Sequence, residues 1–323
     1  MTAYNFHNPV MLKEVLSFVP PKKLTYVDMT LGRAGHASNI LKILKKGSSF
    51  YGIDRDEDAL TYSKNLLKPY EKKVSLNFLH STFAEAIPLL KENGLSQADF
   101  ILFDIGVSSP QFDDPKRGFS YRYDAPLDMR MDQESKLTAS DIVNTYSEKD
   151  LCYVFGTLGQ CHIYYPVVKK ILLARTVKPI KTTFELVDII KSSLPSHELN
   201  KKGHPAKQFF LGLRYEVNQE IPQLKKGLTE AIEFLAPKGR LVIISFNSEE
   251  DKIVKDTFKE YIDLPKSDKY HPIIDEKQPD YLTLTRKPLV PDEEEVALNN
   301  RCKPSILRAL ERKENHERPN QKN

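Results

Sequence analysis

An aspartate stands between an apolar run, residues 98–103, and a long loop. The run is typical of a buried strand, and Asp104-Ile105-Gly106 ends it. The chain then continues to Met131 through Asp, Arg, Pro, Gly and aromatic residues with no helical or strand period. Long ordered loops of this kind are usually functional. Because open α/β sheets bind ligands at the carboxyl ends of their strands, we expect Asp104 to face a ligand.

A glycine-containing turn and a second aspartate are further candidate ligand residues. Gly32 and Gly35 lie in DMTLGRAGHA, residues 28–37, which follows a strand-like run and opens a helix. Asp54 ends the next strand-like run, about twenty residues beyond Ala34, where a carboxylate can accept both ribose hydroxyls. The full Gly-x-Gly-x-x-Gly pattern, which a pyrophosphate needs most, is absent. This favours an adenosine cofactor without phosphates, such as S-adenosylmethionine. The alternative is an ordinary turn with a surface aspartate.

Three more residues are candidates for the same site. His36 is either a helix-start residue or a cofactor contact. Phe83, after the third strand-like run, can stack on an adenine, although a core phenylalanine is the commoner outcome at such a position. Gln111, in the long loop, offers a hydrogen-bond donor and an acceptor.

The second half of the loop interleaves cations and aromatic rings. This combination can neutralise phosphates and stack on unpaired RNA bases, or the rings can simply pack the loop onto its own domain. The residues are Arg117, Phe119, Tyr121, Arg122 and Tyr123. More basic residues follow later and either add to the attraction of RNA or are merely solvated. They are Lys201, Lys202, Lys207 and Arg214.

The elements that must position these residues alternate at first between strand and helix. Strand-like runs occur at 24–29, 49–53, 74–79 and 98–103, with helical patterns at 36–45, 56–67 and 83–91. This alternation predicts βαβ units around a parallel sheet.

The pattern then changes to consecutive helices, which predicts an inserted helical subdomain. Helical patterns occur at 147–159, 166–176 and 182–194. One more helix is expected at 216–236, ended by Pro237-Lys238-Gly239. A buried strand at 240–246 and a final edge strand at 280–286 then resume the sheet. The polar residues from 311 onward are expected to be disordered.

Composition and charge are those of a cytoplasmic globular protein. The 323 residues, 40% of them hydrophobic, suffice for about two domains. No apolar run approaches the roughly 18 residues of a membrane span, and the first residues do not read as a secretory signal. The three cysteines form no metal-type cluster, so we expect no metal and a reducing compartment. The net charge of +4 is compatible with nucleic acid without requiring it.

The motifs together resemble those of the bacterial RsmH (MraW) methyltransferase family. They are spread over nearly the whole chain in the family's order, and GVSS at 106–109 and PLDMRM at 126–131 are the most specific. Others are HNPVMLKEVL at 7–16, YVDMTLGRAGH at 26–36, YGIDRD at 51–56, STFAE at 81–85, LTASDIVN at 137–144, LRYEVNQE at 213–220 and SFNSEEDKIVK at 245–255.

The resemblance implies an α/β fold: a class I, Rossmann-like S-adenosylmethionine-dependent methyltransferase sheet with an inserted all-α subdomain. It implies methylation of the N4 amine of a cytidine in 16S ribosomal RNA of the small subunit. The expected methyltransferase domain comprises residues 1–134 and 214–310, the helical substrate-binding insert residues 135–213, and a disordered tail residues 311–323. A homodimer is left open.

The resemblance also assigns roles by position. The cofactor contacts would be Ala34, Gly35, His36, Asp54, Phe83, Asp104 and Gln111. We expect Asp104 to be catalytic as well, lining the amine together with the backbone carbonyls of residues 105–108. The expected substrate contacts are Arg117, Phe119, Tyr121 and Arg214. Among them, Phe119 and Tyr121 would cradle an extruded base.

The chain departs from the family pattern mainly outside the cofactor half. Ala34 replaces a glycine and Asn247 a histidine, and residues 155–159 and 206–214 of the insert differ. The altered insert and Asn247 motivate an alternative function, in which a divergent relative binds RNA or a ribosome precursor with little or no catalysis. A methyltransferase for a small molecule or DNA is disfavoured. Ile105-Gly106-Val107 stands where DNA amino-methyltransferases usually carry a Pro-Pro-aromatic step.

Overall fold

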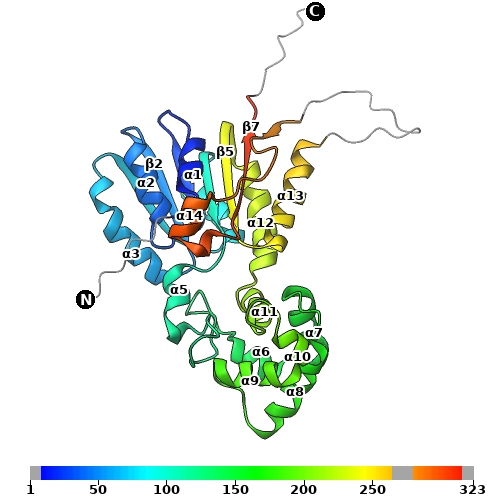
Figure 1. Cartoon of the computed structure of the whole chain (residues 1–323). Coiled ribbons are helices and arrows are strands. Elements are labelled where there is room, and N and C mark those ends of the chain that lie inside the picture. The colour runs from blue at the N-terminus through cyan, green and yellow to red at the C-terminus, as the bar shows by residue number, and fades with distance from the viewer. Residues whose placement is uncertain (1–8, 264–278, 315–323) are drawn as a thin grey trace, which may run out of the picture. The chain divides into compact units, whose positions relative to one another are not determined.

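The computed structural model describes residues 9–263 and 279–314, which divide into two compact units. The sheet unit contains the residues up to Gly106 and those from Gln223 onward, and the helical unit runs from Val107 to Pro222. The helices and strands of both are labelled in Figure 1.

The described part of the sheet unit forms a seven-stranded sheet in the order β3-β2-β1-β4-β5-β7-β6. The strands are β1 (Thr25–Asp28), β2 (Ser48–Asp54), β3 (Val74–His80), β4 (Ala98–Asp104), β5 (Leu235–Ser245), β6 (Tyr281–Thr283) and β7 (Ile306–Arg312). Strands β1 to β5 are parallel, whereas β7 runs antiparallel between β5 and β6. The chain order reverses between β1 and β4, which is where sheets of this kind bind ligands.

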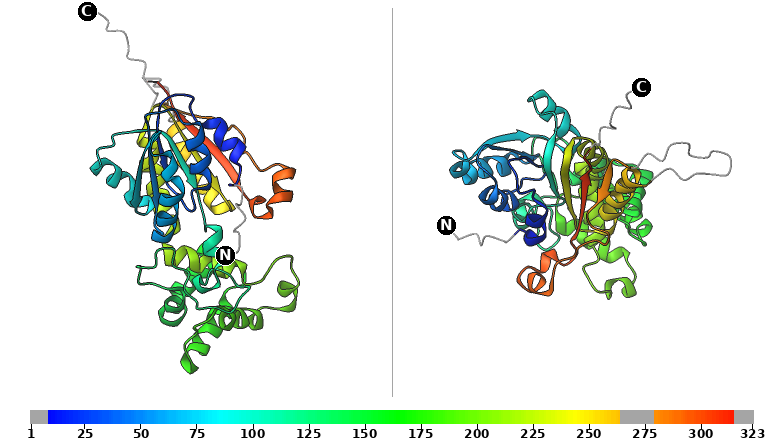
Figure 2. Two further views of the ribbon diagram at one scale, coloured as in Figure 1. Left: turned by 90° about the vertical axis from the view of Figure 1, so that its left-hand side faces the viewer. Right: turned by 90° about the horizontal axis from the view of Figure 1, so that it is seen from above.

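Helices cover both faces of this sheet (Figure 2). They are α1 (Leu12–Phe18), α2 (Gly35–Ile43), α3 (Glu57–Leu67), α4 (Phe83–Glu92), α12 (Glu220–Glu233), α13 (Ser248–Ile262) and α14 (Glu293–Leu298), with short 3-10 turns η1 (Lys68–Tyr70) and η4 (Asn300–Cys302). Local chemistry explains where helices begin. The carboxylate of Asp56, for example, accepts the Asp58 N–H at 3.1 Å and caps α3.

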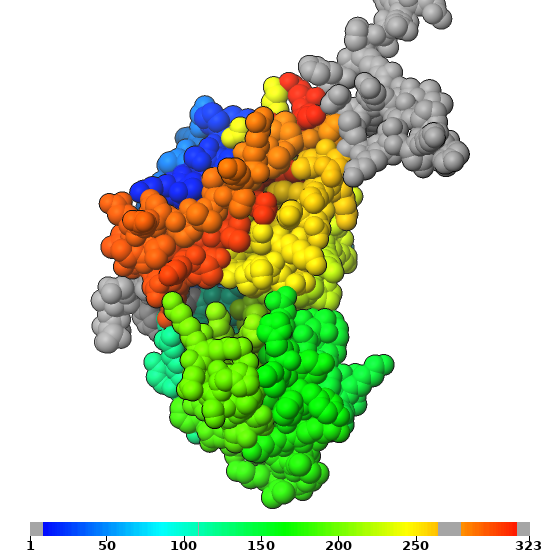
Figure 3. All heavy atoms as spheres, turned by 45° about the vertical axis from the view of Figure 1, so that its right-hand side comes forward, coloured from blue at the N-terminus to red at the C-terminus, as the bar shows by residue number. Residues whose placement is uncertain are grey.

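An aromatic cluster lies at the centre of one face of the sheet. The ring of Tyr26 in β1 lies 5.1 Å from that of Phe50 in β2 and 5.5 Å from that of Phe100 in β4. All three are fully buried, together with apolar residues of α2 and α3. The segment containing α14 (orange in Figure 3) lies beside the segment containing α1 (blue). There, the Met11 N–H donates to Glu295 at 2.6 Å.

The helical unit consists of short helices around one apolar core. They are α5 (Ser109–Asp113), η2 (Pro115–Arg117), α6 (Ala139–Thr145), α7 (Glu148–Cys152), the π-helical turn η3 (Tyr153–Leu158), α8 (Tyr165–Val177), α9 (Thr183–Ser193), α10 (Ser196–Leu199) and α11 (Lys207–Asn218). Thr138 and Thr182 form capping boxes that start α6 and α9.

The predicted α/β fold is confirmed, and the first four strands lie where the sequence placed them. Three details were wrong. The expected helix at 216–236 is two helices, because Gln219 adopts a left-handed conformation with φ 50° between α11 and α12. The strand expected at 240–246 already begins at Leu235. The loop after Asp104 contains the short helix α5, which a capping box at Ser108 starts.

The C-terminal part of the sheet also differs from the expectation. The strand expected at 280–286 is the short edge strand β6, and it is followed by β7. Residues 311 and 312 of the expected disordered tail end β7, and residues 315–323 lie outside the described residues. The helical unit, 107–222, is wider than the insert expected at 135–213, because the loop before it packs onto the helical core.

Candidate active site

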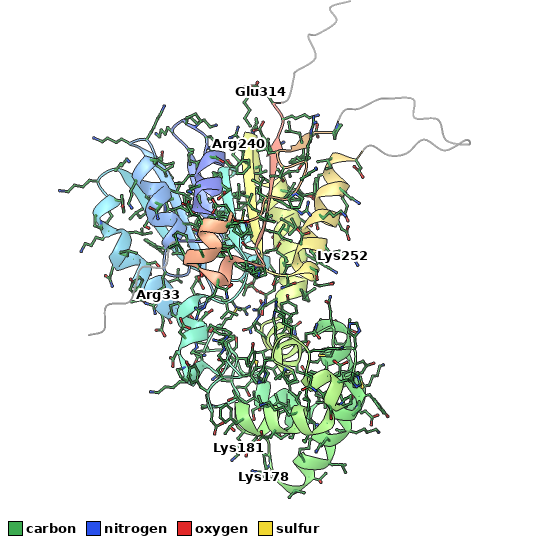
Figure 4. All side chains as sticks on the ribbon, in the orientation of Figure 1. Arg33, Lys178, Lys181, Arg240, Lys252 and Glu314 are labelled. Atoms are coloured by element: carbon green, nitrogen blue, oxygen red, sulfur yellow. The ribbon has the colours of Figure 1, made fainter. Side chains whose placement is uncertain are left out.

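Three neighbouring strands of the sheet unit each end in an aspartate. Asp28 ends β1, Asp54 ends β2 and Asp104 ends β4, and the strands are adjacent in the order β2-β1-β4. Because the strands are parallel, the three carboxyl groups lie at the same edge. In Figure 4, Arg33, which follows β1, marks this edge, and Arg240 of β5 lies at the opposite end of the strands.

Two backbone N–H groups hold Asp54, one of them from the turn between β1 and α2. The Gly32 N–H donates to Asp54 Oδ2 at 2.7 Å, and the Asp56 N–H donates to Oδ1 at 2.9 Å. Gly32 has φ 50°, which glycine adopts without the steric cost of a side chain. Asp54 is half-buried, and each oxygen keeps a second lone pair that can accept a ribose hydroxyl.

The first residues of α2 are packed closely. Ala34 precedes the helix with φ 57° and is fully buried, so its methyl group is held in a left-handed conformation that favours glycine. A Cβ on Gly35 would lie 3.4 Å from the ring of Pro9. His36 is buried, and its Nε2 lies 2.8 Å from the carbonyl oxygen of Val10. Since that oxygen can only accept, Nε2 carries the proton.

Asp104 is the least satisfied of the three acids. Its Oδ2 lies 3.5 Å from Nδ1 of His36. Its Oδ1 is buried and has no hydrogen-bond partner among the described residues. Its backbone N–H donates to Thr30 Oγ1 at 2.6 Å, which fixes the end of β4 against the turn after β1.

The electrostatics of this edge follow from burial. Desolvation raises the pKa of Asp28 and of Asp54 to about 6. Desolvation, followed by the charge of Glu250, raises the pKa of Asp104 to about 7. Burial lowers the pKa of His36. The edge therefore holds carboxyl groups that are costly to ionise and a neutral imidazole, and a cation near Asp104 would offset that cost.

S-adenosylmethionine fits these residues. An ammonium group would give the buried Oδ1 of Asp104 the partner that it lacks. A ribose fits Asp54, whose position at the end of β2 is the one that adenosine cofactors select. Phe83 opens α4, is half-buried and packs edge-on against Phe103 at 5.6 Å, which leaves part of its ring accessible to an adenine.

Gln111, the remaining predicted cofactor contact, belongs to the helical unit. It is buried in α5, where its Oε1 accepts the Ser108 N–H at 3.1 Å and completes the capping box. Its role toward a cofactor stays a prediction.

The predicted substrate contacts have partners within the helical unit. Arg117 donates to the carbonyl oxygens of Arg130 and Met131 at 3.1 and 2.8 Å. Arg214 donates through Nε and a terminal nitrogen to the two oxygens of Glu220 at 2.8 and 3.0 Å. Phe119 is buried in the helical core, the alternative that the sequence left open. Tyr121 is only partly buried and stacks on His204.

The departures from the family pattern have structural explanations. Asn247 caps α13, accepting the N–H groups of Glu249 and Glu250 at 3.1 and 3.0 Å. Gly212 lets α11 approach the π-helical turn, since a Cβ there would lie 2.4 Å from the Val154 carbonyl oxygen. The altered insert residues thus form part of one close packing contact.

Three residues that act at this edge were not identified from the sequence. Thr30 fixes the backbone of Asp104, Val10 orients His36, and Glu250 raises the pKa of Asp104. Thr30 and Val10 lie inside motifs that were matched to the family without a role. Glu250 also lies inside a matched motif, residues 245–255, but only the fold brings α13 to the end of β4.

Among the described residues, no group of three or more histidine, cysteine or acidic residues is placed to hold a metal ion. None of the helices in the described part of the chain has the length and apolar character that crossing a bilayer demands.

Comparison with known proteins places the chain in a family. The model of the MraW methylase family matches residues 4–313. Ribosomal RNA small subunit methyltransferase H of Lactiplantibacillus plantarum is 42% identical over 95% of this chain and 97% of that protein. The protein of the same name from Streptococcus equi is 42% identical over 95% and 98%. Similarity to solved structures is weaker: TrmN from Thermus thermophilus has a TM-score of 0.41 at 11% identity, over 94% of this chain and 48% of that one. The chain belongs to the MraW methylase family.

Proposed function

We propose that this protein methylates the N4 amine of a cytidine in 16S ribosomal RNA, with S-adenosylmethionine as the methyl donor. The observation that carries the proposal is Asp104 at the end of β4, with a buried oxygen that has no partner among the described residues. Family membership supports a methyltransferase, and the names of the relatives support small-subunit ribosomal RNA as the substrate.

The cofactor would be held by side chains and backbone groups of the sheet unit. Asp104 Oδ1 accepts from its ammonium group, Asp54 accepts from its ribose hydroxyls, and Phe83 contacts its adenine. Ala34, Gly35 and His36 form the turn against which it lies. The contact that the family resemblance assigns to Gln111 stays a prediction, because Gln111 belongs to the helical unit. When bound, S-adenosylmethionine supplies an electrophilic methyl group on a sulfonium, so the protein needs no metal to activate it.

The protein's part in the reaction is to position the amine. The lone pair of a cytosine N4 amine is delocalised into the ring, which makes the amine a poor nucleophile. Backbone carbonyls of residues 105–108, together with Asp104, would accept hydrogen bonds from its N–H groups. They would stabilise the charge that develops as the nitrogen becomes tetrahedral. Tyr121 remains a candidate for contact with RNA, whereas Arg117, Phe119 and Arg214 serve first to hold the helical unit together.

The binding-only alternative is not favoured. Its two motives were Asn247 and the altered insert, and both have structural roles that leave the aspartates of β1, β2 and β4 in place. Action on ribosomal RNA also implies the cytoplasm as the compartment, and a homodimer stays a prediction.

Incubation of unmodified small subunits with labelled S-adenosylmethionine, followed by mass mapping of the RNA, tests the proposal. We expect a single methyl group on N4 of one cytidine. Label on another base position would change the substrate assignment. The absence of label from all RNA, with S-adenosylmethionine still bound, would support the binding-only alternative.

A further inference from the structure

A stacked ring pair lies on the helical unit, outside the candidate active site. The rings of Tyr121 and His204 are parallel within 8°, with centroids 4.3 Å apart. The edge of Phe210, 5.7 Å from Tyr121, supports the stack from the core side. Both stacked residues are half-buried, so the pair is anchored in the unit and still reaches its surface.

The backbone fixes which nitrogen of His204 carries the proton. The Ala206 N–H donates to Nδ1 at 3.2 Å, so in the neutral ring Nε2 bears the hydrogen. No described residue accepts a hydrogen bond from Nε2. His204 therefore offers an N–H donor that the described part of the helical unit leaves unused.

The charges of two cations act on the ring of His204. Burial lowers the pKa of His204, and the charges of Lys191 and Arg122 lower it further. Both cationic residues are exposed, and neither side chain forms an ion pair within the described residues. No acidic group contributes to the pKa shift. We call Tyr121, Arg122, Lys191 and His204 the ring–cation cluster.

The ring–cation cluster contrasts with the other arginines of the helical unit. Arg130 and Arg214 pair with Asp128 and Glu220, and Arg117 and Arg175 donate to backbone carbonyls. Those four arginine side chains stabilise the fold by binding acceptors within the helical unit. Among the described residues, the side-chain donors of the ring–cation cluster have no hydrogen-bond or ion-pair acceptor, and such a group is complementary to an anion.

We propose that the ring–cation cluster binds the sugar–phosphate backbone of a single-stranded segment of the RNA substrate. Arg122, Lys191 and His204 Nε2 would donate to phosphate oxygens, and the accessible part of the ring stack would contact an adjacent base. This rests on the proposed function, because it takes the substrate to be RNA. Single-stranded RNA is favoured over an acidic protein because stacked rings beside cations recognise bases and phosphates together.

Substitution of the two cations gives the first test. Arg122→Gln, Lys191→Gln and the double variant are compared with Lys181→Gln, with a fragment of 16S RNA as the probe. Lys181 is an exposed lysine just before α9, whereas Lys191 is in the last turn of that helix, so the control removes the same charge from its other end (Figure 4). Melting temperature and affinity for S-adenosylmethionine check that each variant is folded.

We expect the double variant to bind the fragment about tenfold more weakly. The slope of log affinity against log salt should become shallower by about 1.4, since each phosphate contact to a single strand contributes about 0.7. Lys181→Gln should bind as the wild type does. A double variant with wild-type affinity and salt slope would overturn the inference. Weaker binding to assembled subunits but not to the RNA fragment would also overturn it, in favour of an acidic ribosomal protein.

The ring of His204 gives a second readout. NMR titration of its Cε1–H, without and with the RNA fragment, measures its pKa directly. A phosphate beside Nε2 favours the charged ring, so the fragment should raise the pKa, against the lowering that Lys191 and Arg122 cause in the free protein. An unchanged pKa with RNA bound would contradict the inference. If the wild type methylates small subunits and these signals are absent, the inference fails while the proposed function stands.

Discussion

Charged residues in the sheet unit and in the helical unit differ in how their charges are satisfied. At the carboxyl edge of the sheet, burial raises the pKa of Asp28, Asp54 and Asp104, and one buried oxygen of Asp104 has no partner among the described residues. In the helical unit, Arg214 is only 16% exposed and pairs with Glu220 through two nitrogens. A buried charged group without a partner indicates a ligand site, whereas a buried charged group that is paired within the protein indicates a structural role. The sequence alone marked both sets of residues as candidate functional residues.

The largest effect of a substitution is expected at Asp104, whose buried oxygen has no partner among the described residues. Asp104→Asn keeps the size of the side chain but removes the charge that would face the cofactor ammonium. Affinity for S-adenosylmethionine should fall by about 100- to 1000-fold, the loss typical of a buried charge pair. Calorimetric titration measures it, and methyl transfer to small subunits should fall with it. Full turnover by this variant would remove Asp104 from the site.

Breaking the buried ion pair between Arg214 and Glu220 should lower the stability of the protein. Arg214→Met leaves Glu220 buried without its cation, and we expect a loss of about 2–3 kcal/mol in the free energy of unfolding, measured with urea. Lys178→Met breaks the exposed pair with Glu185, and its cost should stay below about 1 kcal/mol. If Arg214→Met instead keeps its stability and weakens RNA binding, the satisfied pair serves the substrate after all.

The pH dependence of stability should also distinguish Asp104 from the paired charged residues of the helical unit. The pKa of Asp104 is raised from 3.8 to about 7 in the folded protein, so this group favours folding at low pH, and its contribution is lost as pH rises toward 7. Asp104→Asn should therefore gain stability over the wild type between pH 5 and 8, by about 1–2 kcal/mol once partial exposure is allowed for. Urea titrations at several pH values measure the difference. A difference that is constant with pH would mean that Asp104 is not perturbed.

The smallest effect is expected at Ala34. Ala34→Gly removes the backbone strain of an alanine in the left-handed conformation, which favours folding. It also removes a buried methyl group and increases the conformational entropy of the unfolded chain, which disfavour folding, so the two effects nearly cancel. We expect a change below about 1 kcal/mol in the free energy of unfolding and little change in affinity for S-adenosylmethionine. Ala34→Val, which places a branched side chain at the same φ, is the sensitive control and should destabilise clearly. A large gain in affinity from Ala34→Gly would show that the alanine weakens cofactor binding.

The sequence predicted the elements whose signals are local. Strand-like runs predicted β1 to β4, and the helical pattern at 182–194 predicted α9, whereas α6 was not predicted. Gln219 was missed because nothing about glutamine signals a left-handed conformation. β7 was missed because ALER reads as helix, and its strand conformation comes from pairing with β5.

The candidate site, too, was predicted only where the sequence carries a local signal. Asp54 and Asp104 stand out at the ends of predicted strands, so their common edge followed from the βαβ pattern. Whether Arg117, Phe119 or Arg214 faces a ligand or a neighbour depends on tertiary contacts that no spacing reveals. The cations near His204 come from segments far apart in the sequence, which is why the ring–cation cluster was visible only in the fold.

Proton release on cofactor binding tests the role of Asp104 most directly. Calorimetric titrations of the wild type at pH 7, in two buffers of different ionisation enthalpy, count the protons released. Because the pKa of Asp104 is about 7, we predict that about half a proton leaves when S-adenosylmethionine binds and its ammonium group holds the carboxylate ionised. Methylthioadenosine, which lacks the amino-acid part, should bind without this release. No release with S-adenosylmethionine, or equal release with both ligands, would contradict the assignment of Asp104 to the cofactor.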